Sequence, residues 1–214
     1  MSGATTENSN YEMSDPDVRL MLQVRNDDAS AFEELVARYQ NRLIAVLDHL
    51  VGQRQTAEDL TQEVFLRVYR ARKTYSPDAR FSTWIYRIAH NVASNWLRMH
   101  SRRREVRAPA TNVGDTDEIS LEQLAKAASG LMPARRLDNT ELSEIVRLAM
   151  ECLPEQQRMA LLLSKFEEMS YADVAQAMEL TVSSVKSLLW RARENLRVVL
   201  EPYLQQGARP ERKS

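Results

Sequence analysis

The sequence predicts an all-α protein made of two small helical domains joined by a flexible linker. Only five glycines and seven prolines occur among 214 residues, so few positions can form the tight turns of a β-protein. Residues that favour helices, above all Leu, Ala, Arg, Glu and Met, are abundant. Apolar residues recur at helical spacing in two stretches, with a segment of different composition between them.

The first domain is expected at residues 15–105, after a flexible leader at residues 1–14 that shows little periodicity. Pro16 suits the first turn of a helix because its missing N–H would have no partner there. Thr56 is expected to cap the third helix, ahead of carboxylates in its first turn. Breaks divide the domain into about four helices, and they fall near residues 26–29, 51–55 and 75–80.

Residues 106–138 have the composition of a linker, because glycines and prolines interrupt a stretch rich in Ala, Asp and Thr. Within it, Ser120 and Gln123 could cap one short helix at residues 121–128. Helical patterning resumes in the second domain, residues 139–202, before a polar tail at residues 203–214. The helices expected in this domain lie at residues 141–153, 154–166, 171–178 and 182–200.

The last two of these helices have the spacing of a DNA-binding helix-turn-helix. Ser170 is expected to cap the first and Thr181 the second, which leaves a turn of about four residues. Opposite the apolar side, the second helix exposes Trp190, Arg191 and small serines, a mixture suited to base edges in a major groove. The alternative is a core element with a solvated basic side. The apolar side, expected to face the core, carries Val185, Leu188, Leu189, Ala192, Leu196, Val199 and Leu200.

A second outward surface is expected on the helix that begins near Phe81. One side of this helix follows the i, i+3, i+4 rule and is predicted to be core, Trp96 included. An aromatic ring, amides and cations together suit unstacked, single-stranded bases, because stacking requires an exposed base face. The alternative is a solvent-exposed polar face on which the tryptophan has no binding role. The outward side carries Trp84, Arg87, Asn91, Ser94, Asn95 and Arg98, followed by a cluster of arginines.

The helix at residues 58–70 has too many apolar residues for one buried stripe. Leu60, Val64 and Val68 can face the core. Spare apolar surface ringed by acidic and polar side chains indicates a protein partner, unless a neighbouring helix covers it. The remaining apolar residues and their polar neighbours are Phe65, Leu66, Tyr69, Asp59, Gln62 and Glu63.

Composition excludes several classes of protein. The formal net charge of −1 means that any nucleic-acid binding must come from local basic patches. The single cysteine, Cys152, cannot form an internal disulfide, and its side chain is expected to be buried in the core. No apolar run approaches the ~20 residues of a membrane span, and the polar N-terminus lacks the apolar core of a signal peptide. A cytoplasmic protein without membrane insertion is expected.

The sequence offers no catalytic site. It contains no phosphate-binding glycine loop, no metal-ligand spacing among His49, His90 and His100, and no base placed to activate Cys152. No enzymatic activity, metal or cofactor is therefore expected.

Six motifs, in order, resemble the extracytoplasmic-function (ECF) group of sigma-70-type sigma factors, which are non-catalytic subunits that direct RNA polymerase to promoters. The motifs are Ala31-Phe-Glu-Glu-Leu-Val-Ala-Arg-Tyr, Ala57-Glu-Asp-Leu-Thr-Gln-Glu-Val-Phe, Phe81-Ser-Thr-Trp-Ile-Tyr-Arg-Ile-Ala-His-Asn, Leu153-Pro-Glu-Gln-Gln-Arg, Ser170-Tyr-Ala-Asp-Val-Ala and Val185-Lys-Ser-Leu-Leu-Trp-Arg-Ala-Arg. The resemblance implies that residues 15–105 are sigma domain 2, which melts and reads the −10 element. It likewise implies that residues 139–202 are sigma domain 4, which reads the −35 element.

The outward faces described above and the resemblance together give three sets of expected contact residues, of which Trp84, Arg87, Asn95, Arg98, Leu66, Tyr69 and Ser183 come from the faces alone. Contacts to −10 DNA are expected from Tyr75, Ser76, Phe81, Trp84, Arg87, Asn91, Asn95, Arg98, Arg102, Arg103 and Arg104. Contacts to −35 DNA are expected from Ser183, Ser184, Lys186, Ser187, Trp190 and Arg191. Contacts to core polymerase are expected from Asp59, Gln62, Glu63, Phe65, Leu66 and Tyr69. Many relatives carry arginine at the position of Lys186, and lysine lacks the planar fork, so guanine pairing there is not expected to transfer unchanged.

The implied partners are core RNA polymerase, through its β′ clamp helices and β flap, promoter DNA, and in many relatives an anti-sigma factor. The chain is expected to be a monomer outside the holoenzyme. Promoter elements about 17 base pairs apart lie roughly 58 Å from each other at about 3.4 Å per pair. A tether of about 33 residues spans roughly 30 Å as a coil and roughly 110 Å when stretched, so it must be partly extended. The alternative function is a stand-alone helix-turn-helix transcription regulator, which would give the outward-facing Trp84 and Asn91 no role in binding.

Overall fold

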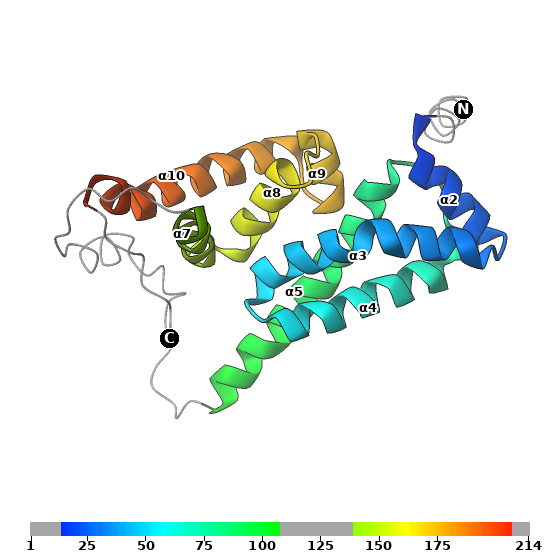
Figure 1. The fold of residues 1–214 in the computed structure, drawn as a ribbon, viewed down its shortest axis with the longest axis horizontal. Helices are drawn as coiled ribbons and strands as arrows, with labels where there is room; N and C mark the ends of the chain where they lie inside the picture. The colour runs from blue at the N-terminus through cyan, green and yellow to red at the C-terminus, as the bar shows by residue number, and fades with distance from the viewer. Residues whose placement is uncertain (1–13, 108–138, 207–214) are drawn as a thin grey trace.

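The computed structural model describes residues 14–107 and 139–206, and within these ranges all regular structure is helical (Figure 1). The all-α prediction is therefore confirmed for the described residues. Most of the predicted linker, its short helix at residues 121–128, and most of the predicted leader and tail lie outside them, whereas residues 106–107 of the predicted linker are the end of a helix. Side chains are described for residues 14–101 and 145–201.

The first domain consists of four α-helices and one short 3-10 helix: α2 (Pro16–Arg25), α3 (Ala29–Val51), α4 (Arg54–Ala71), η1 (Arg72–Thr74) and α5 (Phe81–Arg107). Gly52, which adopts a left-handed conformation with φ of 73°, ends α3. One sequence prediction is wrong here, because α4 begins at Arg54 and Thr56 does not cap it. The Thr56 hydroxyl instead donates to the side-chain oxygen of Gln53, at 3.1 Å.

The second domain contains the helix-turn-helix that the sequence predicted. Ser170 accepts the N–H of Asp173 at 3.1 Å, and Thr181 accepts the N–H of Ser184 at 3.1 Å, so both expected caps are confirmed. Val185 and Leu189 on the expected inner side of the last helix are buried. The helices are α7 (Asn139–Glu151), α8 (Glu155–Lys165), α9 (Tyr171–Ala177) and α10 (Val182–Gln206).

The two domains pack against each other, which the sequence did not predict. Helices α8 and α9 lie beside α3 and α5 (Figure 1). The Thr83 hydroxyl on α5 donates to Asp173 at 3.1 Å. An ion pair also joins Arg42 on α3 to Glu167, whose side chain is only 5% exposed. We call this packing of the second domain on the first the closed arrangement.

Arg158 on α8 connects the ends of two helices within the closed arrangement. Its guanidinium donates to the carbonyls of His49 at 2.9 Å and Leu50 at 3.3 Å, near the end of α3. It also donates to the carbonyls of Glu151 and Leu153, both at 2.8 Å, at the end of α7. These carbonyls have no helical partner, and a cation is favourable beside them. One side chain thus satisfies four acceptors across the two domains.

Two partly buried histidines, His49 and His90, should make stability depend on pH. Burial lowers the pKa of each below its ordinary value of about 6.5, so the unfolded chain binds protons more readily than the folded one. The free energy of unfolding should therefore fall as the pH drops through that value. Urea denaturation at pH 7.5 and 5.5 checks this, and a variant with both histidines replaced by glutamine should lose much of the difference. Equal pH dependence in that variant would contradict the assignment.

Candidate nucleic-acid and protein-binding surfaces

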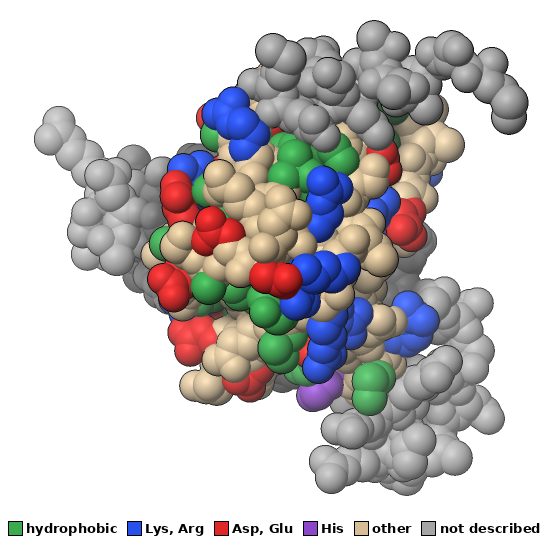
Figure 2. Space-filling model, turned by 90° about the vertical axis from the view of Figure 1, so that its right-hand side faces the viewer, with side chains coloured by type: hydrophobic (Ala, Val, Ile, Leu, Met, Phe, Trp, Pro, Cys, Tyr) green, Lys and Arg blue, Asp and Glu red, His purple; other side chains and the backbone are tan. Residues whose placement is uncertain are grey.

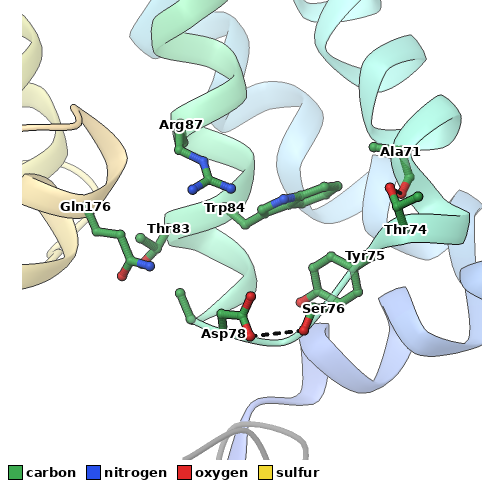
Figure 3. Close-up of a pocket in the computed structure, with 10 residues that line it drawn as sticks. Ala71, Thr74, Tyr75, Ser76, Asp78, Thr83, Trp84, Arg87 and Gln176 are labelled. Atoms are coloured by element: carbon green, nitrogen blue, oxygen red, sulfur yellow. Dashed lines mark hydrogen bonds between the residues drawn. The ribbon is translucent and has the colours of Figure 1, made fainter. Parts of the chain in front are cut away.

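A small pocket lies between the start of α5 and the loop that precedes it (Figure 3). Its volume is about 180 Å³, and cavities of roughly 150 Å³ are known to admit one benzene ring. The pocket is therefore of a size for a single planar ring. It is lined by Ala71, Thr74, Tyr75, Ser76, Asp78, Ala79, Thr83, Trp84, Arg87 and Gln176.

The aromatic residues at this pocket have different roles. The rings of Tyr75 and Trp84 meet edge to face with centroids 4.9 Å apart. Trp84 is half-buried and Tyr75 is 4% exposed. Phe81 is fully buried, with its ring 5.2 Å from that of Tyr39, so the prediction that it contacts DNA needs correction. Its side chain supports the pocket from the core, and no base can reach it in this arrangement.

From the pocket onward, α5 carries the amide and cationic row that the sequence predicted, and its first member, Arg87, also lines the pocket. Arg87 and Asn91 are half-buried, whereas Asn95 and Arg98 are exposed. Residues three or four apart lie on one helical face, so this row continues from Trp84. The backbone of residues 102–104 continues α5, but these three arginine side chains lie outside the described residues. On the face of the molecule in Figure 2, Lys and Arg side chains form a band, with most Asp and Glu side chains to its left.

The second domain covers part of this α5 face. Gln176, at the end of the first helix of the helix-turn-helix, lines the pocket and lies near Thr83 (Figure 3). Further along α5, the Ser94 hydroxyl donates to Glu155 at 2.6 Å. The closed arrangement therefore places part of the second domain over the surface predicted to bind single-stranded DNA.

The predicted recognition surface of α10 faces outward. Trp190 is 64% exposed, and its prediction as an outward-facing tryptophan is confirmed. Ser184 is half-buried, and its hydroxyl lies 2.9 Å from that of Thr181, so it helps to cap the helix. The exposed positions of the predicted set are Ser183, Lys186, Ser187, Trp190 and Arg191. Small hydroxyls, cations and one aromatic ring on a single helix can contact both phosphates and base edges.

A groove of about 770 Å³ runs between α3 and α4. Leu66 and Tyr69, at 50% and 42% exposure, present apolar surface to it. Phe65, which the sequence left open, is 8% exposed and packs edge to face on Phe32. The remaining predicted residues are polar and lie at the surface of α4: Asp59 and Gln62 are exposed, and Glu63 pairs with Arg67 at 2.7 Å. Of these three, only Gln62 lines the groove, whose charged lining residues are Arg54 and Glu58, paired at 2.9 Å. The groove therefore combines an apolar floor with a charged rim, as protein interfaces do.

Two family models match the two domains. The model described as Sigma-70 region 2 matches residues 35–103, and the model described as Sigma-70, region 4 matches residues 143–196. The chain is 35% identical over 191 residues to the RNA polymerase sigma-H factor of Pseudomonas aeruginosa, covering 89% of this chain and 97% of that protein. It is 32% identical over 185 residues to the ECF RNA polymerase sigma-E factor of Escherichia coli K12, covering 86% and 94%. The chain belongs to the ECF sigma factors.

As an ECF sigma factor, the chain binds core RNA polymerase and directs promoter-specific initiation of transcription. Its fold is also that of a solved structure of CnrH in complex with the cytosolic domain of CnrY. That likeness has a TM-score of 0.62 at 22% identity, covering 87% of this chain and 98% of CnrH. RpoE in complex with the anti-sigma factor NepR, from Bartonella quintana, has a TM-score of 0.57 at 21% identity, covering 79% and 96%.

Several residues of this sigma factor were missed by sequence reasoning. Phe32 and Val36 supply the α3 side of the groove, and their apolar spacing was the available signal. Gln176 and the ion pair of Arg42 with Glu167 carry no sequence signal, because their roles depend on how the domains pack. Cys152, expected to be buried, is half-buried just after α7.

The described ranges contain no group of three or more His, Cys, Asp or Glu residues placed to hold a metal ion. None of the helices within those ranges is both long and apolar enough to cross a bilayer.

Proposed function

We propose that residues 15–105 capture an unpaired base of the −10 element and that residues 139–202 read the −35 element. The observation that carries this proposal is the pocket of about 180 Å³, because it lies beside a row of amides and cations on α5. Capture of an unstacked base lowers the free-energy cost of opening the duplex. Core polymerase supplies the chemistry, and this chain contributes no catalytic group, metal or cofactor.

The −10 surface suits a single strand for physical reasons. Trp84 offers a ring that can contact a base whatever its identity. Asn91 and Asn95 can pair with base edges, whereas Arg87 and Arg98 neutralise phosphates. Arg102, Arg103 and Arg104 extend this basic row along the sequence and are assigned to the same strand.

The −35 surface on α10 is proposed to enter a major groove. Replacing Arg191 by alanine should weaken the preference for the −35 element by about tenfold to a hundredfold, because a bidentate base contact is worth about 1–3 kcal/mol. Competition binding of holoenzyme to promoter DNA with altered −35 bases measures this preference. Arg193→Ala removes the same charge from another side of α10 and should change affinity with little loss of base preference. Equal effects of the two variants would contradict the assignment.

The groove between α3 and α4 is the proposed site for the β′ clamp helices of core polymerase. Leu66 and Tyr69 would insert apolar side chains between the partner helices, and Gln62 would meet polar groups at the rim. Asp59 and Glu63 would meet polar groups on the adjoining surface of α4. The second domain is assigned to the β flap. An anti-sigma factor is a further proposed partner, because RpoE of Bartonella quintana, which has this fold, was solved with the anti-sigma factor NepR.

The closed arrangement must open before both promoter elements can be read. The elements lie roughly 58 Å apart, whereas the two domains are in contact here and Gln176 lines the −10 pocket. Binding to polymerase would supply the free energy of separation. A monomer in the closed arrangement is the form proposed outside the holoenzyme.

Reversing the charge of Glu167 should open the free protein. Glu167→Lys places a cation beside Arg42 at a position with 5% exposure, so the pair becomes repulsive where water screens poorly. The radius of gyration in small-angle X-ray scattering should increase. Glu168→Lys adds the same charge at the exposed neighbouring position and should leave the radius unchanged. If a folded Glu167→Lys variant keeps the wild-type radius of gyration, the ion pair between Arg42 and Glu167 does not hold the two domains together.

Run-off transcription with purified core polymerase tests the proposed function. The full chain, with no other sigma factor, should give transcripts from defined start sites on fragments of its native genome. A stand-alone regulator would bind DNA but give no such transcripts, and that outcome would overturn the proposal.

A further inference from the structure

The loop at residues 75–80, between η1 and α5, is held at both of its ends by helix α2. We propose that Asp15 and Arg25, at the two ends of α2, are positioning residues that set the shape of this loop and so its choice of base. The inference rests on the proposed capture of a −10 base in the pocket that the loop lines (Figure 3). Neither residue lines the pocket itself.

Arg25 fixes the beginning of the loop. Its guanidinium donates to the carbonyl of Tyr75 at 3.4 Å. The backbone carbonyl of Arg25 accepts from the ammonium of Lys73 at 3.0 Å, just before the loop. Asp27 adds a third connection, because its carboxylate pairs with Arg72 at 3.1 Å and also with Lys73. These pairs lower the pKa of Asp27, with the hydrogen bond from Lys73 as the largest cause.

Asp15 fixes the end of the loop. One oxygen of its carboxylate accepts the N–H of Phe81, the first residue of α5, at 3.0 Å. The other oxygen accepts the N–H of Asp17 at 2.9 Å and so caps α2. A single carboxylate thus connects the first turns of two helices, where N–H groups lack helical partners and the dipole favours a negative charge. The pocket begins at this point, since Thr83 and Trp84 lie in the first turn of α5.

Helix α2 is a rigid element between these two contacts. It has ten residues, which makes it about 15 Å long. Its inner side is anchored in the core by Val18, Met21 and Val24, each at most 1% exposed. Both ends of the loop are therefore held at a fixed separation by α2, which reduces the conformational freedom of the residues between them.

This geometry has a consequence for base selection. Ser76 and Asp78 are joined to each other within the loop at 3.0 Å and both line the pocket. Their positions relative to Trp84 depend on where the two loop ends are held. A shift of the loop changes which base fits, whereas stacking on Trp84 tolerates any base. Loss of Asp15 or Arg25 should therefore reduce discrimination between bases more than it reduces binding to DNA.

The test uses holoenzyme assembled from core polymerase and the full chain, with forked DNA whose −10 non-template strand is already single-stranded. Each position of that strand carries each of the four bases in turn. Wild-type holoenzyme should prefer one base at one position, and Asp15→Ala and Arg25→Gln should each reduce that preference about tenfold. This factor corresponds to about 1.4 kcal/mol, the size of one charge-assisted hydrogen bond. Gln23→Ala, at an exposed position of α2, is the matched control and should keep the preference.

The outcomes separate this inference from the proposed function. If Trp84→Ala lowers affinity for forked DNA but Asp15→Ala and Arg25→Gln both keep the wild-type base preference, the positioning role is wrong and base capture stands. If the wild-type holoenzyme shows no preference at any position, the proposed function itself fails. Thermal melting of each variant identifies unfolding, and if Asp15→Ala does not fold, Arg25→Gln alone decides the question.

Discussion

Trp84→Ala should slow the formation of open promoter complexes by about tenfold to a hundredfold, because stacking of a base on an aromatic side chain is worth about 1–3 kcal/mol. The half-buried ring of Trp84 lines the pocket at the start of α5, where the −10 base is proposed to bind. Removing the ring leaves that base without a stacking partner. Permanganate reactivity of promoter thymines against time measures the opening. Affinity for core polymerase should not change, because the proposed core-binding groove lies between α3 and α4.

Trp96→Ala is the matched control for this experiment. Trp96 is on the same helix, but its ring stacks on His100 with centroids 3.9 Å apart, away from the pocket. Opening should stay within about threefold of wild type in this variant. Asn91→Ala should also weaken opening while leaving core binding intact, because the amide is assigned to the same strand. Normal opening by Trp84→Ala would remove this residue from the site.

The largest loss of stability is expected from Arg158→Ala. Four backbone carbonyls would lose their charged donor. A hydrogen bond to a charged group contributes about 1.5–3 kcal/mol to the free energy of unfolding. Water can reach some of these carbonyls after the change, so we expect the free energy of unfolding to fall by about 2–4 kcal/mol. Urea denaturation of the full chain measures it.

Arg158→Lys distinguishes charge from geometry. An ammonium group keeps the cation near the ends of α3 and α7 but lacks the planar fork that contacts both ends at once. It should therefore recover only part of the lost stability. If Arg158→Ala stays within about 0.5 kcal/mol of wild type, the carbonyl contacts contribute nothing measurable.

The periodicity of the sequence was sufficient to predict the helices and most of the two outward faces. Trp190 could be predicted as exposed because the apolar side of α10 is continuous, and Val185 and Leu189 are indeed buried. Periodicity was less reliable at helix ends. A Thr56 cap would start α4 at Ala57, whereas α4 starts at Arg54, three residues earlier, and an error of about one turn leaves the apolar stripe unchanged.

Burial of individual aromatic residues was harder to predict. Phe81 lies four residues before the buried Ile85, so helical periodicity alone places it on the core side of α5, and its expected contact with DNA came from the resemblance. Its ring packs on Tyr39, 42 residues away in the sequence. Phe65 similarly depends on Phe32 of α3. The closed arrangement could not be predicted at all, since hydrogen bonds such as Ser94 with Glu155 require the relative placement of two domains. Local propensity contains no information about such distant pairs.

Site-specific photo-crosslinking is the most direct test of the claim that two separate surfaces read one promoter. A photoreactive amino acid would replace Ser76, which lines the pocket, or Ser187, which is exposed on α10. In open complexes with core polymerase, the group at position 76 should crosslink to the non-template strand of the −10 element. The group at position 187 should crosslink to the −35 duplex, about 17 base pairs away. Crosslinks from both positions to one DNA site, or none from position 76 to single-stranded bases, would contradict the account.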